Sequence, residues 1–143
     1  MGKKIKWGIL GSAHIATEHV IPAMLSCQYG EVYAIASRST EKAQNIAEQF
    51  GIPECYGSYE ELLVDKEVDA IYIPLPNHLH VQWAIKSLEA DKHVLVEKPV
   101  GLSSKEAERL LQETKKYPHL KVMEAFMYRH HPQWIKVKEL VDQ

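Results

Sequence analysis

The sequence has no apolar run long enough to cross a membrane. Its longest apolar stretches, such as residues 70–75 and 94–96, are far shorter than the ~20 residues that a transmembrane helix requires. The start, residues 1–4 (MGKK), leads directly into a short apolar segment and has neither the apolar core nor the small-residue cleavage site of a secretory signal. We therefore expect no membrane partner and a cytoplasmic location.

An excess of charge of one sign is also missing. The chain has 17 Lys and Arg residues against 19 Asp and Glu residues, which gives a formal net charge of -2 at pH 7. Because acidic and basic residues are interspersed along the chain, we expect no basic surface that would attract the phosphate backbone of DNA or RNA. We exclude nucleic acid as a partner on this ground.

Cysteine is scarce, and no cluster of metal-binding residues stands out. The two cysteines, Cys27 and Cys55, are far apart in sequence, and each is predicted to be a small buried hydrophobic residue. The spacing of His78 and His80 resembles that of a metal-binding pair, but side chains two residues apart at a helix start diverge, and no third ligand accompanies them. The sequence predicts no metal site.

What the sequence does contain is a regular alternation of two patterns. Short apolar runs alternate with segments whose apolar residues recur at helical spacing, which predicts an α/β domain with a parallel sheet. With 143 residues and 45% hydrophobic content, the whole chain, residues 1–143, is interpreted as one globular domain. We expect strands over residues 5–10, 32–37, 70–73, 93–96 and 121–126 with a short one near residue 55, and helices over residues 13–27 and 41–50, after Ser58, Asn77 and Ser103, and from Pro132 to the end.

Two helix starts carry a capping signature. Ser58 is followed three residues later by Glu61, and Ser103 by Glu106, a spacing in which serine and glutamate satisfy each other's backbone amides. For the first helix, the helical spacing predicts one inward-facing stripe. The stripe consists of Ala16, Val20, Ala23, Met24 and Cys27.

The first strand runs into a turn that can hold a diphosphate. Gly11 permits a tight turn after the strand, while Ala13 and Ala16 are small enough for close approach of phosphates and for close packing of helix and strand. Ser12, His14 and Ile15 complete the turn and open a helix, whose amino terminus offers free amides and a positive dipole end. An ordinary strand-to-helix turn uses the same residue types, so the prediction depends on the alternating fold around it. That fold is a doubly wound, three-layer α/β/α Rossmann domain with helices on both faces.

The end of the second strand favours NADP over NAD. An NAD site usually has Asp or Glu there to bind the ribose 2′-hydroxyl, and this sequence has none. It has Ser37 and Arg38, followed by Ser39 and Thr40, and a guanidinium flanked by hydroxyls suits a 2′-phosphate. The alternative is that Arg38 is a solvated loop residue.

Five motifs together resemble one enzyme family. They are residues 7–11 (WGILG), 36–39 (ASRS), 74–80 (PLPNHLH), 93–99 (HVLVEKP) and 124–133 (EAFMYRHHPQ). The chain resembles, over essentially its whole length, the glucose-fructose oxidoreductase, inositol dehydrogenase and rhizopine-catabolism family (Gfo/Idh/MocA). It is most similar to the branch with dihydrodiol and xylose dehydrogenases, which commonly prefer NADP.

The resemblance implies roles for residues at the carboxyl ends of the strands, where ligands of such sheets bind. Lys98 of the Glu-Lys-Pro motif would lie by the nicotinamide and the substrate hydroxyl as the catalytic residue, and Tyr128 would lie near the nicotinamide end. Burial or a nearby cationic ring would lower the pKa of such a lysine and suit it to proton transfer. Beyond the phosphate turn, Ser37 and Arg38, the cofactor contacts implied are Pro74, Leu75, Pro76, Asn77, His80, Glu97, Lys98 and Arg129.

The resemblance also implies an NAD(P)-dependent dehydrogenase built from two domains. This chain would supply the cofactor-binding half, and a downstream α+β domain would supply the pocket for a small sugar, polyol or dihydrodiol and a catalytic His or Tyr of its own. We expect a homo-oligomer, and an isolated chain that is almost inactive, because hydride transfer needs the substrate carbon held ~3 to 3.5 Å from the ring. The alternative function is a stand-alone NADP-binding sensor or interaction module.

Overall fold

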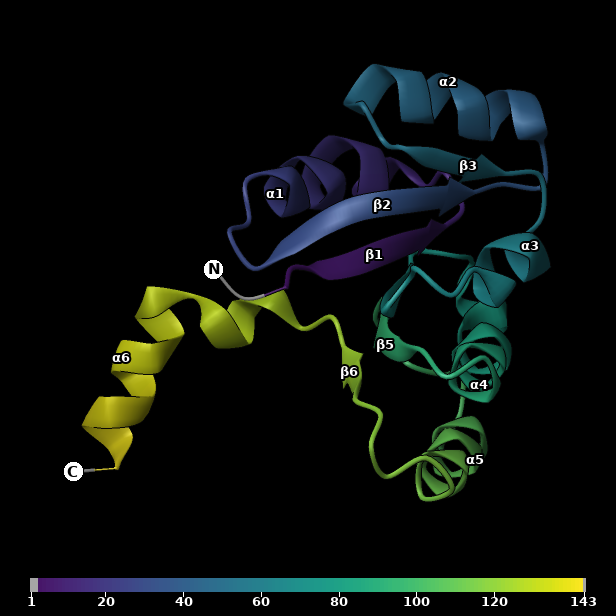
Figure 1. The fold of residues 1–143 in the computed structure, drawn as a ribbon. Coiled ribbons are helices and arrows are strands. Elements are labelled where there is room, and N and C mark those ends of the chain that lie inside the picture. The colour runs from purple at the N-terminus through teal and green to yellow at the C-terminus, as the bar shows by residue number, and fades with distance from the viewer. Residues whose placement is uncertain (1–2, 143) are drawn as a thin grey trace.

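Six short strands form one parallel sheet in the computed structural model, which describes residues 3–142. The order across the sheet is β3-β2-β1-β4-β5-β6, so the chain returns to the middle after β3 and builds outward on the other side (Figure 1). This order and the parallel pairing confirm the predicted Rossmann fold. The strands are β1 (Ile5–Leu10), β2 (Gly30–Ala36), β3 (Glu54–Tyr56), β4 (Ala70–Ile73), β5 (His93–Val96) and β6 (Val122–Glu124).

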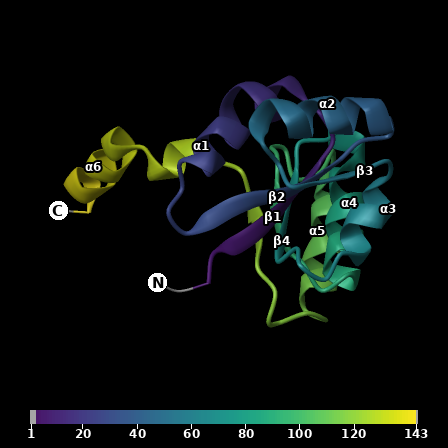
Figure 2. The ribbon, with the colours of Figure 1, turned by 45° about the horizontal axis from the view of Figure 1, so that its top comes forward.

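Helices cover both faces of the sheet and divide the core into two layers (Figure 2). Neighbouring residues of β1 point to opposite faces: Ile9 packs with α1 and α2, and Leu10 packs with α3 and α4. Both side chains are fully buried, which confirms the three-layer arrangement. The helices are η1 (Ala16–Val20), α1 (Ile21–Leu25), α2 (Thr40–Phe50), α3 (Tyr59–Val64), η2 (Asn77–Leu79), α4 (His80–Glu89), α5 (Ser104–Thr114), η3 (Met127–His130) and α6 (Pro132–Val141).

One of the two predicted capping boxes forms completely. At α3, Ser58 accepts a hydrogen bond from the Glu61 amide, and the Glu61 carboxylate accepts one from the Ser58 amide. At α5, Ser103 accepts from the Glu106 amide at 3.3 Å, but the Glu106 carboxylate bonds the Leu102 amide at 2.7 Å instead. In the second capping box, the bond to Ser103 forms as predicted, but the bond from the Ser103 amide to Glu106 does not.

The inward stripe predicted for the first helix is partly wrong. Ala23 and Cys27 are exposed, and Ile21 is buried in their place. The reason is that η1 is a π-helical segment, whose i→i+5 bonds place more residues in each turn than an α-helix does. The buried face therefore rotates relative to an ideal α-helix, and the prediction that Cys27 is buried fails with it.

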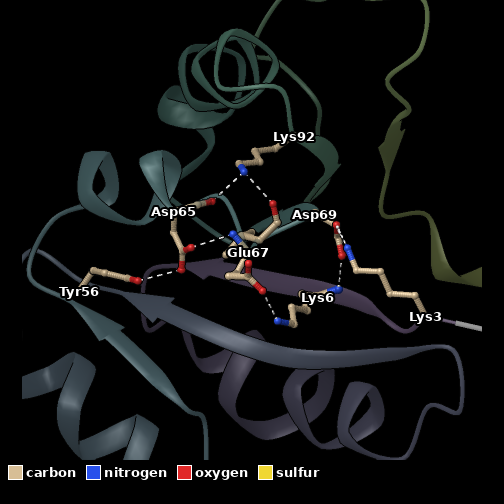
Figure 3. Close-up of polar contacts among 8 residues, drawn as sticks. Lys3, Lys6, Tyr56, Asp65, Glu67, Asp69 and Lys92 are labelled. Atoms are coloured by element: carbon tan, nitrogen blue, oxygen red, sulfur yellow. Dashed lines mark hydrogen bonds and ion pairs between the residues drawn. The ribbon is translucent and has the colours of Figure 1, made fainter.

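A polar network joins the segments at the amino ends of the central strands (Figure 3). Asp69 accepts hydrogen bonds from the Lys6 amide at 2.9 Å and from Nζ of Lys3 at 3.1 Å. Nζ of Lys92 donates to the carbonyls of Asp65 and Val68 at 2.8 and 2.7 Å. Burial lowers the pKa of the Lys92 ammonium, although nearby carboxylates oppose the shift. These contacts stabilise the sheet at the amino ends of its central strands. The candidate site lies at the carboxyl ends of the strands.

The α1 face of the sheet is incompletely covered. A groove of about 560 Å³ lies over β1, β4, β5 and β6, and its walls include Tyr72, Leu95, Met123 and Phe126. Helix α6 projects away from the sheet (Figure 1) and exposes apolar side chains. The exposed residues on it are Trp134, Ile135, Val137, Leu140 and Val141. We call this groove and the α6 side chains together the uncovered apolar face.

None of the helices within residues 3–142 is long and apolar enough to cross a membrane. Within the same residues, no group of three or more His, Cys, Asp or Glu side chains is arranged to hold a metal ion.

Candidate nucleotide-binding site

A groove of about 490 Å³ lies at the carboxyl ends of β1, β2 and β4. The sheet order reverses between β1 and β4, and this is the place where open α/β sheets bind ligands. The residues around the groove come from four separate parts of the chain. They are Gly11, Ser12, Ala13, Ser37, Arg38, Ser39, Lys42, Tyr59, Pro74, Leu75 and Pro76.

Gly11 forms the floor of the groove and can hardly be any other residue. Its φ is +96°, a left-handed conformation that side chains disfavour. A Cβ at this position would lie 2.9 Å from Cδ2 of Leu75 and 3.6 Å from the hydroxyl oxygen of Tyr59. The Gly11 amide donates to the Ala36 carbonyl at 2.7 Å, which fixes the turn beside the end of β2. The turn therefore leaves a small cradle of bare backbone, directly before the helical turn that begins at residue 14.

The other end of the groove is basic. Arg38 is exposed there, and Lys42 lies in the first turn of α2 after the cap residue Ser39. Ser37 is buried, and its hydroxyl accepts a hydrogen bond from the Ser39 amide at 3.4 Å. No described residue that surrounds the groove is Asp or Glu. Two cations, two hydroxyls and a helix amino terminus make this end suitable for a phosphate dianion.

Tyr59 joins the basic end to the Gly11 cradle. Its side chain is only 8% exposed, and its ring packs edge-on against Trp83 with 4.9 Å between the centroids. Burial raises the pKa of the Tyr59 hydroxyl, and the nearby Arg38 guanidinium partly offsets this shift. The hydroxyl thus stays protonated at neutral pH and lies close to both Arg38 and the cradle.

The end of β5 holds a buried acid beside an exposed lysine. The Glu97 carboxylate accepts a hydrogen bond from the Tyr72 hydroxyl at 2.7 Å and one from the Lys98 amide at 3.2 Å. Burial, together with this carboxylate, raises the pKa of the Tyr72 hydroxyl, which therefore remains a donor. The Lys98 side chain is exposed at the carboxyl edge, and the Lys98–Pro99 peptide bond is cis. Glu97 thus fixes the backbone from which Lys98 projects.

His80 lies beneath the surface rather than on it. It is fully buried at the start of α4, and its ring nitrogens lie 2.7 Å from the carbonyl oxygens of Leu75 and Pro99. Asn77, three residues earlier, is exposed at the start of η2, and Arg129 is exposed in η3.

The structure brings together about half of the cofactor residues expected from the sequence. Those around the groove are Gly11, Ser12, Ala13, Ser37, Arg38, Pro74, Leu75 and Pro76. Those expected but not among its walls are His14, Ile15, Asn77, His80, Glu97, Lys98 and Arg129.

Sequence reasoning did not select three residues of the groove: Ser39, Lys42 and Tyr59. Lys42 could have been found, because it lies in the first turn of the helix that follows Arg38, so both cations are near the same helix amino terminus. Tyr59 could not, because only the folded chain brings the start of α3 next to Gly11.

A family model describes this part of the chain. Residues 5–126 match the model of Gfo/Idh/MocA, described as an oxidoreductase family with an NAD-binding Rossmann fold.

Several known proteins are similar over nearly the whole chain. "Uncharacterized oxidoreductase ORF334" of Rhizobium meliloti is 50% identical over 96% of the chain, and D-xylose 1-dehydrogenase (NADP(+)) 2 of Haloferax volcanii is 44% identical over 94%. The crystal structure of KijD10, a 3-ketoreductase from Actinomadura kijaniata in complex with TDP-benzene and NADP, superposes with a TM-score of 0.91 at 41% identity. It covers 98% of this chain. The chain spans only 41% of the length of the two sequence relatives and 44% of the KijD10 chain.

Proposed function

Because this chain belongs to the Gfo/Idh/MocA oxidoreductase family, whose matched region is an NAD-binding Rossmann fold, we propose that it supplies the cofactor-binding half of an NADP-dependent dehydrogenase. The reaction is hydride transfer between the nicotinamide and a secondary alcohol of a small sugar, polyol or dihydrodiol. Two relatives support the choice of cofactor: the D-xylose 1-dehydrogenase (NADP(+)) and KijD10, which was crystallised with NADP.

One observation carries this proposal: the groove pairs a bare-backbone cradle at Gly11 with a basic end that lacks carboxylates. The diphosphate binds over Gly11, Ser12 and Ala13, where first-turn amides have no partner within the helix. The 2′-phosphate binds between Arg38 and Lys42. An NAD site would instead need a carboxylate at this end to accept from the ribose hydroxyls.

Lys98 is the proposed catalytic residue of this half. A bound NADP would supply the hydride acceptor for oxidation of the alcohol, and the proton of the alcohol must go elsewhere. As the free amine, Lys98 would accept the proton of the alcohol, and the ammonium so formed would hydrogen-bond the substrate oxygen and pass that proton to solvent. The exposed side chain at the carboxyl end of β5, on a backbone that Glu97 holds, supports this role. Asn77 and Arg129 are proposed to contact the nicotinamide half of the cofactor.

The substrate pocket is proposed to come from a second domain. The relatives are more than twice as long as this chain, and we propose that in a protein of their length a downstream α+β domain carries the pocket. The uncovered apolar face supports this, because grouped exposed apolar side chains often mark a surface that another structure covers. The chain alone then provides half of an active site.

An assay of this chain with NADPH and aldoses tests the proposal. We expect NADPH to bind, measured by its fluorescence, while NADP⁺ together with a panel of aldoses gives almost no turnover. Hydride transfer requires a substrate held within ~3 to 3.5 Å of the nicotinamide, and one domain cannot hold it there. Robust turnover would contradict the two-domain proposal, and absence of NADPH binding would contradict the cofactor site. NADPH binding without turnover in a protein of the relatives' length would favour a sensor.

We further propose that the isolated chain self-associates through the uncovered apolar face and that the protein is a cytoplasmic homo-oligomer. Half-exposed Trp134 and Leu140 of α6 favour association, because burying such side chains removes apolar surface from water. Light scattering is expected to give a mass above that of the monomer, and the double change of Trp134 and Leu140 to serine should lower it. Val64→Ser, at a still more exposed apolar site on α3, is the control and should leave the mass unchanged. A clean monomer in the unchanged chain would contradict the proposal.

A further inference from the structure

The segment between β5 and α5 carries Lys98 without forming a helix or a strand. Its backbone groups must find other partners, because an unpaired amide or carbonyl away from water is costly. Before Lys98 the partner is Glu97, whose carboxylate accepts from the Lys98 amide at 3.2 Å and is itself bonded to the Tyr72 hydroxyl at 2.7 Å. The chain after Lys98 needs a second anchor.

Glu124, the last residue of β6, provides that anchor. Its Oε1 atom accepts a hydrogen bond from the Val100 amide at 2.7 Å. The next residue, Ala125, donates its amide to the Val96 carbonyl at 2.8 Å. Two adjacent residues at the end of β6 thus bond to the chain two residues after Lys98 and two residues before it. We call these two bonds the Lys98 bracket.

The two bonds of the Lys98 bracket depend on different groups. The bond from Ala125 to Val96 joins two backbones and continues the ladder between β5 and β6, so it does not depend on a side chain. The bond from Val100 depends on the Glu124 side chain, and within residues 3–142 it is the one hydrogen bond that this amide makes. Both residues are half-buried beside α5. Removing the Glu124 carboxylate therefore opens one side of the bracket and leaves the other side intact.

The Lys98 bracket joins two parts of the chain that have separate roles in the proposed function. Lys98 is the proposed catalytic residue, and Arg129 in η3, shortly after Glu124, is a proposed contact of the nicotinamide half of the cofactor. Hydride transfer needs such groups at a fixed spacing, because a misplacement of ~1 Å can cost about a hundredfold in rate.

We propose that Glu124 is a positioning residue that fixes the backbone after Lys98 relative to the end of β6, so that Lys98 projects from a segment held on both sides. Glu124 acts through the Val100 amide and does not need to touch the cofactor or the substrate. The inference rests on the proposed function for the role of Lys98, but the bracket itself does not. The alternative role, stabilisation of the edge strand β6 alone, predicts no change around Lys98 when the carboxylate is removed.

Amide hydrogen exchange and ¹⁵N relaxation of Glu124→Ala test the Lys98 bracket without any cofactor. We expect the Val100 amide to exchange at least about tenfold faster, because its bond to a carboxylate is lost, and the Ala125 amide to stay protected. The order parameter of the Lys98 amide, about 0.85 for rigid backbone, is expected to fall toward about 0.6. Unchanged values for Val100 and Lys98 in a folded variant would overturn the proposal.

Glu124→Gln tests whether the bond to Val100 is what Glu124 contributes. The glutamine side chain keeps an oxygen that can accept from this amide, so Val100 protection and the Lys98 order parameter should match those of the unchanged chain. A glutamine variant as loose as the alanine variant would overturn the proposal. If Glu124→Ala does not fold, the unchanged chain still decides: a Val100 amide that exchanges as fast as an exposed loop amide would exclude the bracket.

Glu106→Ala is the matched control. The Glu106 carboxylate accepts from the Leu102 amide at 2.7 Å, which is the same kind of bond at the same distance, four residues after Lys98. This variant should speed up exchange of the Leu102 amide and leave Val100 and Lys98 as they were. Equal loosening of Lys98 in both variants would contradict a specific role for Glu124.

Turnover in a protein that has the relatives' length and carries this chain tests what the bracket positions. With NADP⁺ and the panel of aldoses, Glu124→Ala is expected to lower kcat about tenfold and to change NADPH affinity less than about twofold, because other loops form the groove for the phosphates. Unchanged kcat would overturn the positioning role. Absence of turnover before any substitution would instead contradict the proposed function, and the exchange experiments would still decide the bracket.

Discussion

Replacing Arg38 by alanine is expected to weaken NADPH binding by roughly ten- to a hundredfold and to leave NADH binding almost unchanged. A hydrogen bond to a charged group contributes ~1.5 to 3 kcal/mol, and ~1.4 kcal/mol corresponds to a tenfold change in affinity. NADH lacks the 2′-phosphate and so loses nothing when the guanidinium is removed. Fluorescence titration of each variant with both cofactors measures the effect.

The matched control for this prediction is Arg109→Ala. Arg109 is an exposed arginine on α5 and is not part of the groove, so its removal changes the net charge equally without removing a phosphate contact. Equal losses for NADPH and NADH in Arg38→Ala would defeat the assignment of the 2′-phosphate site. So would an equal loss of NADPH affinity in the Arg109 variant, because the effect would then be one of overall charge.

Replacing Gly11 by valine is expected to weaken NADPH and NADH alike, by about a hundredfold or more. The substitution narrows the space over the turn, where we propose that the diphosphate binds, and even a Cβ would lie 2.9 Å from Cδ2 of Leu75. It also forces a β-branched residue into a φ of +96°, which costs of order 1–3 kcal/mol. Thermal unfolding measures the stability change, and titration with both cofactors measures the loss of affinity.

Gly51→Val separates backbone strain from loss of the cradle. Gly51 ends α2 with a φ of +66°, and nothing lies within 4 Å of the position of its Cβ. The variant is therefore expected to lose stability through strain alone and to bind both cofactors normally. A Gly11 variant that is folded and binds as tightly as the unchanged chain would place the diphosphate elsewhere.

The strand bounds followed from the sequence for three of the central strands. The bounds of β1, β4 and β5 agree with the predicted ones, whereas β2, which is also central, covers Gly30–Ala36 instead of residues 32–37. The bounds of β6 were predicted too widely, at residues 121–126 instead of Val122–Glu124. β6 is an edge strand, and the residues on either side of it, Lys121 and Ala125, still bond to β5 through one backbone group each, so the difference is small.

The error in the first helix has a different origin. Apolar spacing predicts a buried face only if the number of residues per turn is known, and the π-helical segment η1 changes that number. Ile21 is buried as a result, while Ala23 and Cys27 are exposed. Nothing in a single sequence marks such a segment.

The candidate site could be predicted only where its residues follow strand ends. Gly11 and Arg38 come directly after β1 and near the end of β2, so topology alone places them at one edge of the sheet. Tyr59 joins the groove because α3 packs behind it, and this contact depends on tertiary structure. His80 was expected at the surface of the groove from motif resemblance, and its burial between two loops is visible only in the folded chain.

A crystal of the chain soaked with NADP tests the central claim most directly. We expect the diphosphate over Gly11 at the start of the first helix, the 2′-phosphate within hydrogen-bond distance of Arg38, and the nicotinamide on the same side of the sheet as Lys98. NADP bound elsewhere, or a nicotinamide directed away from Lys98, would contradict the account.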